Sequence, residues 1–488
     1  MSSGAVSRAR PGPLSRQLLR LALASLLLIP VASSAGAPSG IAAVGRSQTA
    51  ASVTPAARHV VIVSIDGLRP ADYLPGHARR PSMPVLDALR ATGSWAEGVV
   101  GQYPSLTYPS HTSIATGVRS GRHGVSQNTR FDPDNGSTDW FFDSSAIKVP
   151  AIWDLAARGG LTTAGVSWPV TVGAKIDYLI PETHQAPPDM TWLELVRRQS
   201  TAGLIDAVAA RLDPLGPATA RSYRDRDRFS TAAAAYIIEK HRPNLLLIHL
   251  VEVDGARHAT GPESPEAFAA LEGADGRIGE LVKAVEAAGI ARDTAFIVTG
   301  DHGFYRVHSA FQPNAVLRDA GLLETDDRGR IVRWQAVAHR AAIRLKDPQD
   351  AALARRVETL FLDLANGRYQ GLFRVVGREA IARLGGDPDA LLIIEPIEGY
   401  TTAAGVSGGF LVASNRRGDH GFLPTEPGMH TGLVISGAGV LQGIAVPLTR
   451  QIDIAPTAAR LLGLELSEAD GVPIMGVLRN TQVPLVSR

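Results

Sequence analysis

The chain has 488 residues, of which 45% are hydrophobic and 20% charged, and its formal net charge is +2. This composition is ordinary for a soluble globular protein, and the length allows one large domain or several smaller ones. No basic patch with interleaved aromatic residues stands out, so a nucleic acid polymer is not an expected partner. The chain contains no cysteine, which excludes disulfides, thiolate metal ligands, a cysteine nucleophile and a lipoprotein anchor.

The first 37 residues are typical of an export signal. Arginines at positions 8, 10, 16 and 20 accompany the apolar stretch 18–30, and small residues follow at 31–37. This order predicts a cleaved signal peptide and a periplasmic or secreted protein. An uncleaved membrane anchor is the alternative, but a spanning helix needs about 20 apolar residues, so stable membrane insertion is not expected. Residues 38–56 are rich in Ala, Ser, Gly and Thr, and we interpret them as a linker.

From residue 57 to residue 482, apolar runs of strand length alternate with helical patterns. The strand candidates are His59–Ile65, Leu161–Trp168, Asn244–Val253, Thr294–Thr299 and Thr431–Ser436, and the helical stretches include Pro84–Thr92, Thr231–Lys240 and Pro265–Ala288. The strands are continuous Val/Ile/Leu runs, which favours burial on both faces. Strands that alternate with helices predict an α/β fold in which a mostly parallel central sheet is covered on both sides.

Residues 303–418 are less regular than the rest of this catalytic-domain candidate. They contain polar turns such as Thr325–Arg330, although Gln349–Asn366 looks helical. Two interpretations stay open: a subdomain inserted near the site, or a continuation of the same sheet.

Three aspartates fall at the ends of predicted strands. Asp66 follows the first strand, Asp254 ends the third, and Asp301 follows the fourth. In open α/β sheets ligands bind at the carboxyl ends of the strands, so these carboxylates could converge on one edge. An aspartate after a strand is also a common helix N-cap, so no single one indicates a site.

Three histidines accompany these aspartates. His258 follows Asp254 by four residues, a spacing that puts two ligands on one face of a helix. His302 is adjacent to Asp301, and flanking glycines give the backbone the freedom to bring both side chains together. A second Gly-Asp-His-Gly, residues 418–421, presents His420. The six nitrogen and oxygen ligands suit two zinc ions if one more group joins.

Thr107 is the candidate for that further group. It lies in a turn that leads into the predicted helix His111–Thr116. A hydroxyl near a helix N-terminus sits in positive potential, beside N–H groups that suit phosphate. Coordination to a metal can deprotonate a threonine hydroxyl and make it a nucleophile. The alternative is a hydroxyl that only caps the helix.

As an ordered set, these motifs resemble the nucleotide pyrophosphatase/phosphodiesterase family of the alkaline phosphatase superfamily, in its bacterial exported type. The resemblance spans roughly residues 58–478. It rests on Asp66-Gly67, on Thr107 to His111 with Thr116-Gly117 and His123-Gly124, on Trp168-Pro169, on Asp254 to His258, on Asp301-His302-Gly303, on Gly418 to Phe422 and on Ile452 to Gly463. The chain departs from the family pattern at Leu106, at Ser110 and at Gly255, Ala256 and Arg257, which leaves substrate preference open.

The resemblance implies an alkaline phosphatase-like three-layer α/β/α sandwich and two Zn²⁺ ions. One zinc would be held by Asp254, His258 and His420, and the other by Asp66, Thr107, Asp301 and His302. His430 is expected to support a ligand or the local structure rather than bind metal. His111, His123 and His308 are expected to be structural.

The implied reaction is hydrolysis of phosphodiester or phosphoanhydride bonds through a phosphothreonine intermediate. Thr107 would attack phosphorus, while Asn128 and the backbone N–H of Tyr108 would hold the equatorial oxygens. The Tyr108 ring could stack on a base or simply pack. The substrate would be a small-molecule phosphoester.

Other activities stay open on the same fold. Phosphomonoesterases often bind the extra charge with an arginine, and Arg130 is the nearest one to Asn128 in the sequence. Carbon–phosphorus cleavage of the phosphonoacetate type is a further alternative, whereas the sulfatase motif Cys/Ser-x-Pro-x-Arg is missing at Thr107. A metal-free binding scaffold is the non-enzyme alternative, although a scaffold would be expected to lose ligands. The sequence does not indicate the natural substrate or the oligomeric state.

Overall fold

The computed structural model describes residues 55–77, 79–130, 132, 134, 139–210 and 222–479. The predicted signal peptide, residues 1–37, and the predicted linker up to residue 54 lie outside the described residues. Within the described ranges, no helix has both the length and the apolar character needed to cross a bilayer.

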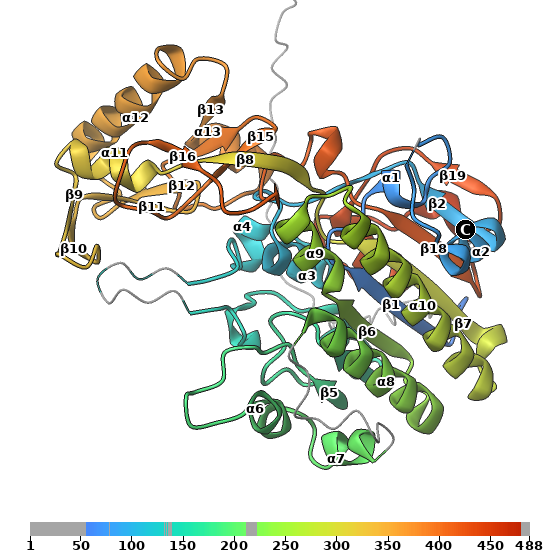
Figure 1. Cartoon of the computed structure of the whole chain (residues 1–488). Helices are drawn as coiled ribbons and strands as arrows, with labels where there is room; N and C mark the ends of the chain where they lie inside the picture. Colours follow the sequence, from blue (N-terminus) through green and yellow to red (C-terminus); the bar gives the residue numbers. More distant parts are fainter. Residues whose placement is uncertain are drawn as a thin grey trace, which may run out of the picture. The chain divides into compact units, whose positions relative to one another are not determined.

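An eight-stranded sheet with the strand order β19-β2-β18-β7-β1-β6-β4-β5 carries the fold (Figure 1). In that order the strands are Ile444–Val446, Gly93–Ala96, Leu433–Gly437, Thr294–Gly300, His59–Ile65, Leu245–Leu250, Thr163–Val166 and Tyr178–Ile180. Neighbours from β7 to β5 are parallel, whereas β18 is antiparallel to both of its neighbours. The prediction of a mostly parallel sheet is confirmed, with one central strand reversed.

Helices cover both faces of this sheet, because the side chains of its strands feed two separate cores. On one face Val61, Val63 and Ile65 pack with α2 (Pro84–Thr92), α8 (Tyr223–His241) and α10 (Pro265–Ala287). On the other face Val60 and Ile62 pack with α3 (Thr107–Thr116), α5 (Ile152–Arg158) and α14 (Ile454–Leu461). Side chains alternate across a strand, so a strand such as β1 that is buried on both sides is mainly apolar. The three-layer α/β/α arrangement follows.

The end of β6 differs from the sequence prediction. The strand stops at Leu250, and helix α9 (Glu252–Thr260) begins two residues later, so Asp254 does not end a strand but lies in the first turn of a helix. Asp227 on α8 causes this early start. Its carboxylate accepts the N–H groups of Val251 and Glu252 at 2.7 and 3.0 Å, which satisfies the free donors of the helix terminus.

The chain between β7 and β18 builds a second set of elements, which we call the 305–419 segment. Strand β8 (Tyr305–Phe311) pairs with β15 (Gly399–Thr402), β16 (Leu411–Ala413) and β17 (Gly418–Asp419). A separate antiparallel sheet has the order β11-β12-β14-β13, formed by Ala336–His339, Ala342–Leu345, Leu392–Pro396 and Phe373–Gly377. Helices α11 (Pro313–Asp319), α12 (Ala351–Asn366) and α13 (Arg378–Leu384) and the hairpin β9–β10 (Leu323–Thr325, Ile331–Trp334) complete it.

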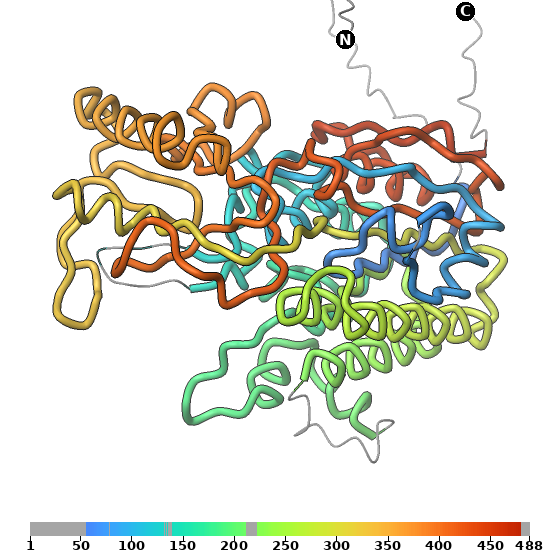
Figure 2. The backbone as a smooth tube through the Cα atoms, turned by 45° about the horizontal axis from the view of Figure 1, so that its top comes forward, coloured from blue at the N-terminus to red at the C-terminus, as the bar shows by residue number. Residues whose placement is uncertain are grey.

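The 305–419 segment has an aromatic core of its own, which includes Phe311, Phe361 and Phe410. None of its described strands pairs with the eight-stranded sheet. The remaining elements are short: α1 (Pro70–Tyr73), α4 (Ser120–His123), α6 (Trp192–Gln199), α7 (Leu204–Ala209) and the paired strands β3 (Val99–Val100) and β20 (Thr449–Arg450). Figure 2 shows the early blue elements beside the late red ones, where β2 lies between β18 and β19.

Candidate active site

The candidate site lies where the carboxyl ends of β1, β6 and β7 meet. These strands are adjacent and parallel, and Ile65 is in register with both Leu250 and Gly300. Asp66 and Asp301 therefore leave neighbouring strands at the same level, and α9 starts beside them. The register explains why residues so distant in the sequence come together.

One group, which we call the inner cluster, consists of Asp66, Asp301 and His302. The His302 Nε2 atom lies 3.2 Å from Asp66 Oδ1, 3.3 Å from Asp301 Oδ2 and 3.3 Å from Thr107 Oγ1. All four side chains are buried. The N–H of Gly67 donates to Asp301 Oδ1 at 2.9 Å. Gly67 has a φ of +82°, and a Cβ there would lie 2.8 Å from the Phe304 ring, so this turn requires glycine.

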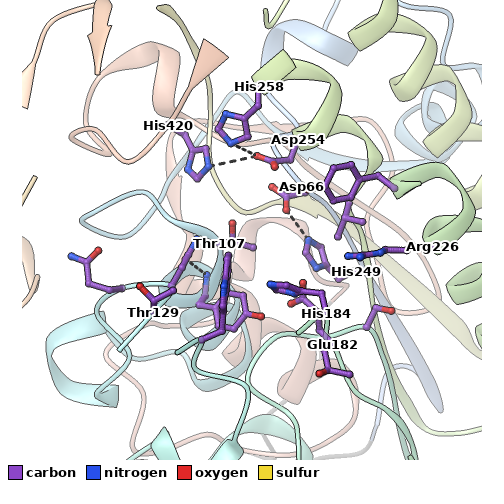
Figure 3. A pocket seen from close by; sticks show the side chains of 18 of the residues that line it. Asp66, Thr107, Thr129, Glu182, His184, Arg226, His249, Asp254, His258 and His420 are labelled. Atoms are coloured by element: carbon purple, nitrogen blue, oxygen red, sulfur yellow. Dashed lines mark hydrogen bonds and ion pairs between the residues drawn. The ribbon is translucent and has the colours of Figure 1, made fainter. Parts of the chain in front are cut away.

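A second group, the outer cluster, consists of Asp254, His258 and His420 (Figure 3). The Nε2 atoms of His258 and His420 lie 3.2 and 3.5 Å from Asp254 Oδ1. Each histidine donates its Nδ1–H to a carbonyl, of Gly418 at 2.8 Å and of Ser105 at 2.9 Å. These bonds leave both Nε2 atoms as acceptors that face the carboxylate. The His302 and His420 rings stack at 3.5 Å, which makes the two clusters adjacent.

The ligand atoms of each cluster fit a metal ion. They lie within 4.8 Å of one another in both clusters. Three buried oxygens, Asp66 Oδ1, Asp254 Oδ1 and Asp301 Oδ2, accept no hydrogen bond of good geometry, although histidine Nε2 atoms lie 3.2 to 3.5 Å from them. An unpartnered buried carboxylate oxygen is unfavourable, and a divalent cation would remove that penalty. Imidazole and carboxylate ligands without thiolates are a donor set that binds zinc and other first-row divalent metals.

Electrostatics couples the members of the inner cluster. Burial raises the pKa of Asp66, but hydrogen bonds and charges from His249 and His302 outweigh it and hold the pKa well below its usual value. Burial raises the pKa of Asp301 to about 7. Burial lowers the pKa of His302, but Asp301 and Asp66 more than compensate and bring it to about 9. The protein alone therefore pairs a carboxylate with an imidazolium at this position.

Two further histidines contact the inner cluster. His249, which the sequence reading did not single out, lies within β6 and places its Nε2 atom 3.1 Å from Asp66 Oδ2. The only sequence signal was an imidazole that interrupts the apolar run Leu245–Leu250. His111 donates its Nδ1–H to the Thr107 carbonyl at 2.8 Å, and the same atom lies 3.6 Å from Asp301. Both rings are buried, and their centroids lie 4.1 Å apart. Through these contacts they hold the carboxylates of Asp66 and Asp301 in orientation.

Thr107 is the first residue of α3, four residues before the expected start of that helix. The residue at the N-cap is Leu106, whose side chain cannot cap, and the Thr107 hydroxyl faces His302 instead. The Asn128 side chain accepts the N–H of Tyr108 at 3.0 Å. The Tyr108 N–H, which was expected to hold an equatorial oxygen together with Asn128, thus has Asn128 as its acceptor in this structure. The helix terminus remains favourable to an anion.

Asp66 of the inner cluster, all three residues of the outer cluster and Thr107 border a cavity of about 500 Å³. Beyond Thr107 its wall carries Glu182, His184 and Arg226 (Figure 3). The same end is lined by the aromatic side chains of Trp140, Trp192, Tyr223 and Phe229. The Tyr108 ring is only 1% exposed and packs against Trp140, with ring centroids 5.1 Å apart. A flat substrate group would therefore meet mainly the other aromatic residues of this wall.

The remaining sequence candidates lie outside the two clusters. His123 is buried and hydrogen-bonds Ser113 at 2.9 Å, whereas the exposed side chain of His308 contacts Ser309 at 2.9 Å. The half-buried His430 belongs to neither cluster. The Arg130 guanidinium lies over the Phe141 ring at 5.0 Å and does not line the cavity.

Arg257 is one of the departures from the family pattern. It is buried and lies on α9 between Asp254 and His258 in the sequence. Its Nη2 lies 2.7 Å from Asp72 Oδ1, and its Nη1 donates to the Gly67 carbonyl. Burial lowers the pKa of the guanidinium to about 10, with Asp72 opposing the shift. Arg257 thus ties α9 to the Gly67 turn and fixes the two clusters relative to each other.

Comparison with known proteins agrees with this architecture. Residues 60–423 match the family model described as type I phosphodiesterase / nucleotide pyrophosphatase. An uncharacterized pyrophosphatase/phosphodiesterase of Schizosaccharomyces pombe is 28% identical over 283 residues, which cover 58% of this chain and 50% of that protein. Human ectonucleotide pyrophosphatase/phosphodiesterase family member 1 is 25% identical over 248 residues, which cover 50% of this chain and 23% of that protein.

Solved structures share the fold. Human ectonucleotide pyrophosphatase/phosphodiesterase 5 matches with a TM-score of 0.62 and 20% identity, covering 86% of this chain and 100% of that one. An inactive threonine-to-alanine variant of the murine protein, in complex with AMP, gives the same values. Because the family model spans most of the chain, the protein belongs to the type I phosphodiesterase / nucleotide pyrophosphatase family.

Proposed function

We propose that the protein hydrolyses phosphodiester or phosphoanhydride bonds of small nucleotides and related phosphoesters, with Thr107 as the nucleophile. The main support for this proposal is the position of the Thr107 hydroxyl. It lies 3.3 Å from His302, at the start of α3, and it lines the cavity. A hydroxyl with these neighbours and no helix-capping role is placed for attack on phosphorus.

Two zinc ions fit the donor atoms of the site. In this proposal Asp66, Thr107, Asp301 and His302 hold one, and Asp254, His258 and His420 hold the other. Bound there, the ions would lower the pKa of the Thr107 hydroxyl and offset the negative charge of the phosphoryl group.

The side chains of the protein would carry out the rest of the reaction. The Thr107 oxygen forms a bond to phosphorus while the bond to the leaving oxygen breaks on the opposite side. Water then attacks the phosphothreonine and restores the hydroxyl. The NH₂ group of Asn128 would donate to a non-bridging oxygen, and the N-terminus of α3 would favour the negative charge of that oxygen. His249 keeps the Asp66 carboxylate in orientation through their 3.1 Å contact.

The relatives support this assignment. Several are named pyrophosphatase/phosphodiesterases, and venom phosphodiesterases of Crotalus adamanteus are 24% identical over 264 residues. The murine structure with AMP is of a variant that lost a threonine and is inactive. The monoesterase alternative loses its sequence candidate, because Arg130 packs on Phe141. We also propose that the protein works after export, on the strength of the signal pattern in residues 1–37.

The deciding experiment is a substrate panel on zinc-loaded protein: bis-(p-nitrophenyl) phosphate, p-nitrophenyl phosphate and phosphonoacetate. We expect the diester to be hydrolysed fastest, with activity removed by a chelator and restored by zinc. Exclusive turnover of the monoester or of the phosphonate would replace the proposal by the corresponding alternative. Rapid quenching with acid should trap phosphate on Thr107, which mass spectrometry of the peptide would locate.

A further inference from the structure

Two arginines of the 305–419 segment line the cavity beside the outer cluster. Arg340 lies in the turn between β11 and β12, and Arg416 lies just before β17. We propose that Arg340 and Arg416 form a subsite for a phosphate carried by the leaving group of the substrate. This inference rests on the proposed function and narrows it to phosphoanhydrides, such as nucleoside triphosphates that release pyrophosphate.

The two guanidinium groups share a single carboxylate. Asp419 Oδ1 lies 2.9 Å from Arg416 Nη1 and 3.6 Å from Arg340 Nη2. The Asp419 side chain is 2% exposed, whereas those of Arg416 and Arg340 are 41% and 31% exposed. Neither arginine has a second acidic partner among the described residues. One positive charge therefore stays uncompensated by Asp419, on cationic side chains that reach solvent within the cavity.

The position of the arginines relative to the two clusters identifies what they face. Arg416 Nη1 lies 3.2 and 3.3 Å from the ring nitrogens of His258, in the outer cluster. Thr107 lies beside the inner cluster, 3.3 Å from His302, and an in-line displacement puts the leaving oxygen opposite the nucleophile. The leaving oxygen thus points toward the outer cluster, and a phosphate attached to it would meet the guanidinium groups next.

The turn that carries Arg340 is held in place. Arg340 has a φ of +53°, a conformation that residues with a Cβ rarely adopt. The preceding residue, His339, hydrogen-bonds Thr129 at 2.9 Å, next to Asn128. The turn is therefore tied to the loop that carries Asn128, the proposed hydrogen-bond donor to the phosphoryl oxygens. A guanidinium fixed in this way can present paired N–H groups to phosphate oxygens.

Arg226, the third arginine that lines the cavity, lies at the opposite end from Arg340 and Arg416. Arg226 lies beyond His249 (Figure 3), and its guanidinium stands 5.6 Å from the Tyr223 ring centroid. That end is aromatic and suits the part of the substrate that stays on phosphorus. The cavity thus has an aromatic end and a doubly cationic end, with Thr107 and the clusters between them.

Two substrates that share the retained thymidine 5′-phosphoryl group test the subsite. Thymidine 5′-triphosphate releases pyrophosphate, and the p-nitrophenyl ester of thymidine 5′-monophosphate releases a nitrophenol without phosphate. We expect Arg340→Gln to lower the kcat/KM ratio of triphosphate to ester by about tenfold, the effect of one lost charged hydrogen bond. Adding Arg416→Gln should lower the ratio further. The control Arg383→Gln, 72% exposed on α13, should leave the ratio unchanged. An unchanged ratio in Arg340→Gln overturns the inference.

A binding measurement separates this inference from the proposed function. Zinc-loaded Thr107→Ala protein is titrated calorimetrically with AMP and with α,β-methylene-ADP, which carries one more phosphate on the leaving side. We expect the analogue to bind about tenfold more tightly, and Arg340→Gln to remove the difference. Equal affinities in the Thr107→Ala protein overturn the subsite, whatever the turnover. Hydrolysis of the ester with no discrimination in binding would keep the proposed function and discard the subsite.

Discussion

The inner and outer clusters use the same ligand types in different settings. The inner cluster is built at the ends of β1 and β7, and the side chains of Asp66, Asp301 and His302 are 6%, 0% and 0% exposed. The outer cluster combines helix α9 with the end of the 305–419 segment, and Asp254 and His258 are 20% and 18% exposed. The inner cluster is held by strand ends that a ladder of hydrogen bonds fixes, whereas the outer cluster is held by a helix and a loop and is more open to solvent.

The largest effect should come from the nucleophile next to the inner cluster. We expect Thr107→Ala to lower kcat by about a thousandfold or more, because no other hydroxyl takes the position beside His302. Its zinc content and melting temperature should stay close to wild type. Thr107→Ser, which keeps a hydroxyl, is the matched control and should retain part of the activity. Wild-type turnover in Thr107→Ala would remove Thr107 from the mechanism.

The next effect separates the clusters by metal content. Asp254→Asn should reduce bound zinc from two ions to about one and lower kcat/KM by about a hundredfold, because the two histidines of the outer cluster lose their shared carboxylate. Elemental analysis after dialysis measures the bound zinc, and steady-state kinetics measures kcat/KM. Asp319→Asn, an exposed carboxylate on α11, controls for loss of charge. Retention of both ions would show that Asp254 is not a ligand.

A smaller effect should reach only the outer cluster. Asp227→Ala removes both hydrogen bonds that start α9, the helix that carries Asp254 and His258. We expect zinc affinity at the outer cluster to fall about tenfold, as is typical when a supporting residue is lost, while the inner ion is retained. Competition with a chromophoric chelator would resolve the two affinities. If both fell equally, the two clusters would not be independent.

The smallest expected effect concerns pH and the 305–419 segment. Glu395 on β14 is buried between Tyr103 and Leu423, and burial raises its pKa to about 7. A carboxyl group with a raised pKa in the folded state stabilises the fold fully below its unfolded value of about 4.3 and loses that contribution as pH rises through 7. The contribution of Glu395 to the free energy of unfolding should therefore fall between these pH values, and Glu395→Gln should remove it, so that the stability of the variant falls less with pH than that of wild type. Urea titrations at pH 5 and pH 8 measure the change in stability of each protein. An equal change in wild type and Glu395→Gln would refute the assignment.

Many features of the site were predictable from short stretches of sequence. The strands β1, β6 and β7 are mainly apolar runs because both of their faces are buried. Asp66 and Asp301 follow two of those runs directly, and the glycines beside them permit tight turns. Local chemistry of this kind identifies the motifs without knowledge of what lies opposite them.

Other features depended on contacts between distant residues. His249 reads as part of an apolar strand until the register of β6 on β1 brings it to Asp66, and Asp254 lies on a helix because Asp227, on another helix, starts α9 early. The antiparallel direction of β18 and the convergence of Arg340 and Arg416 on Asp419 likewise depend on partners from elsewhere in the chain. Sequence by itself determined which residues could carry the chemistry, because side-chain type and spacing are local. The tertiary structure decided which of them meet, because register and packing are set by the whole chain.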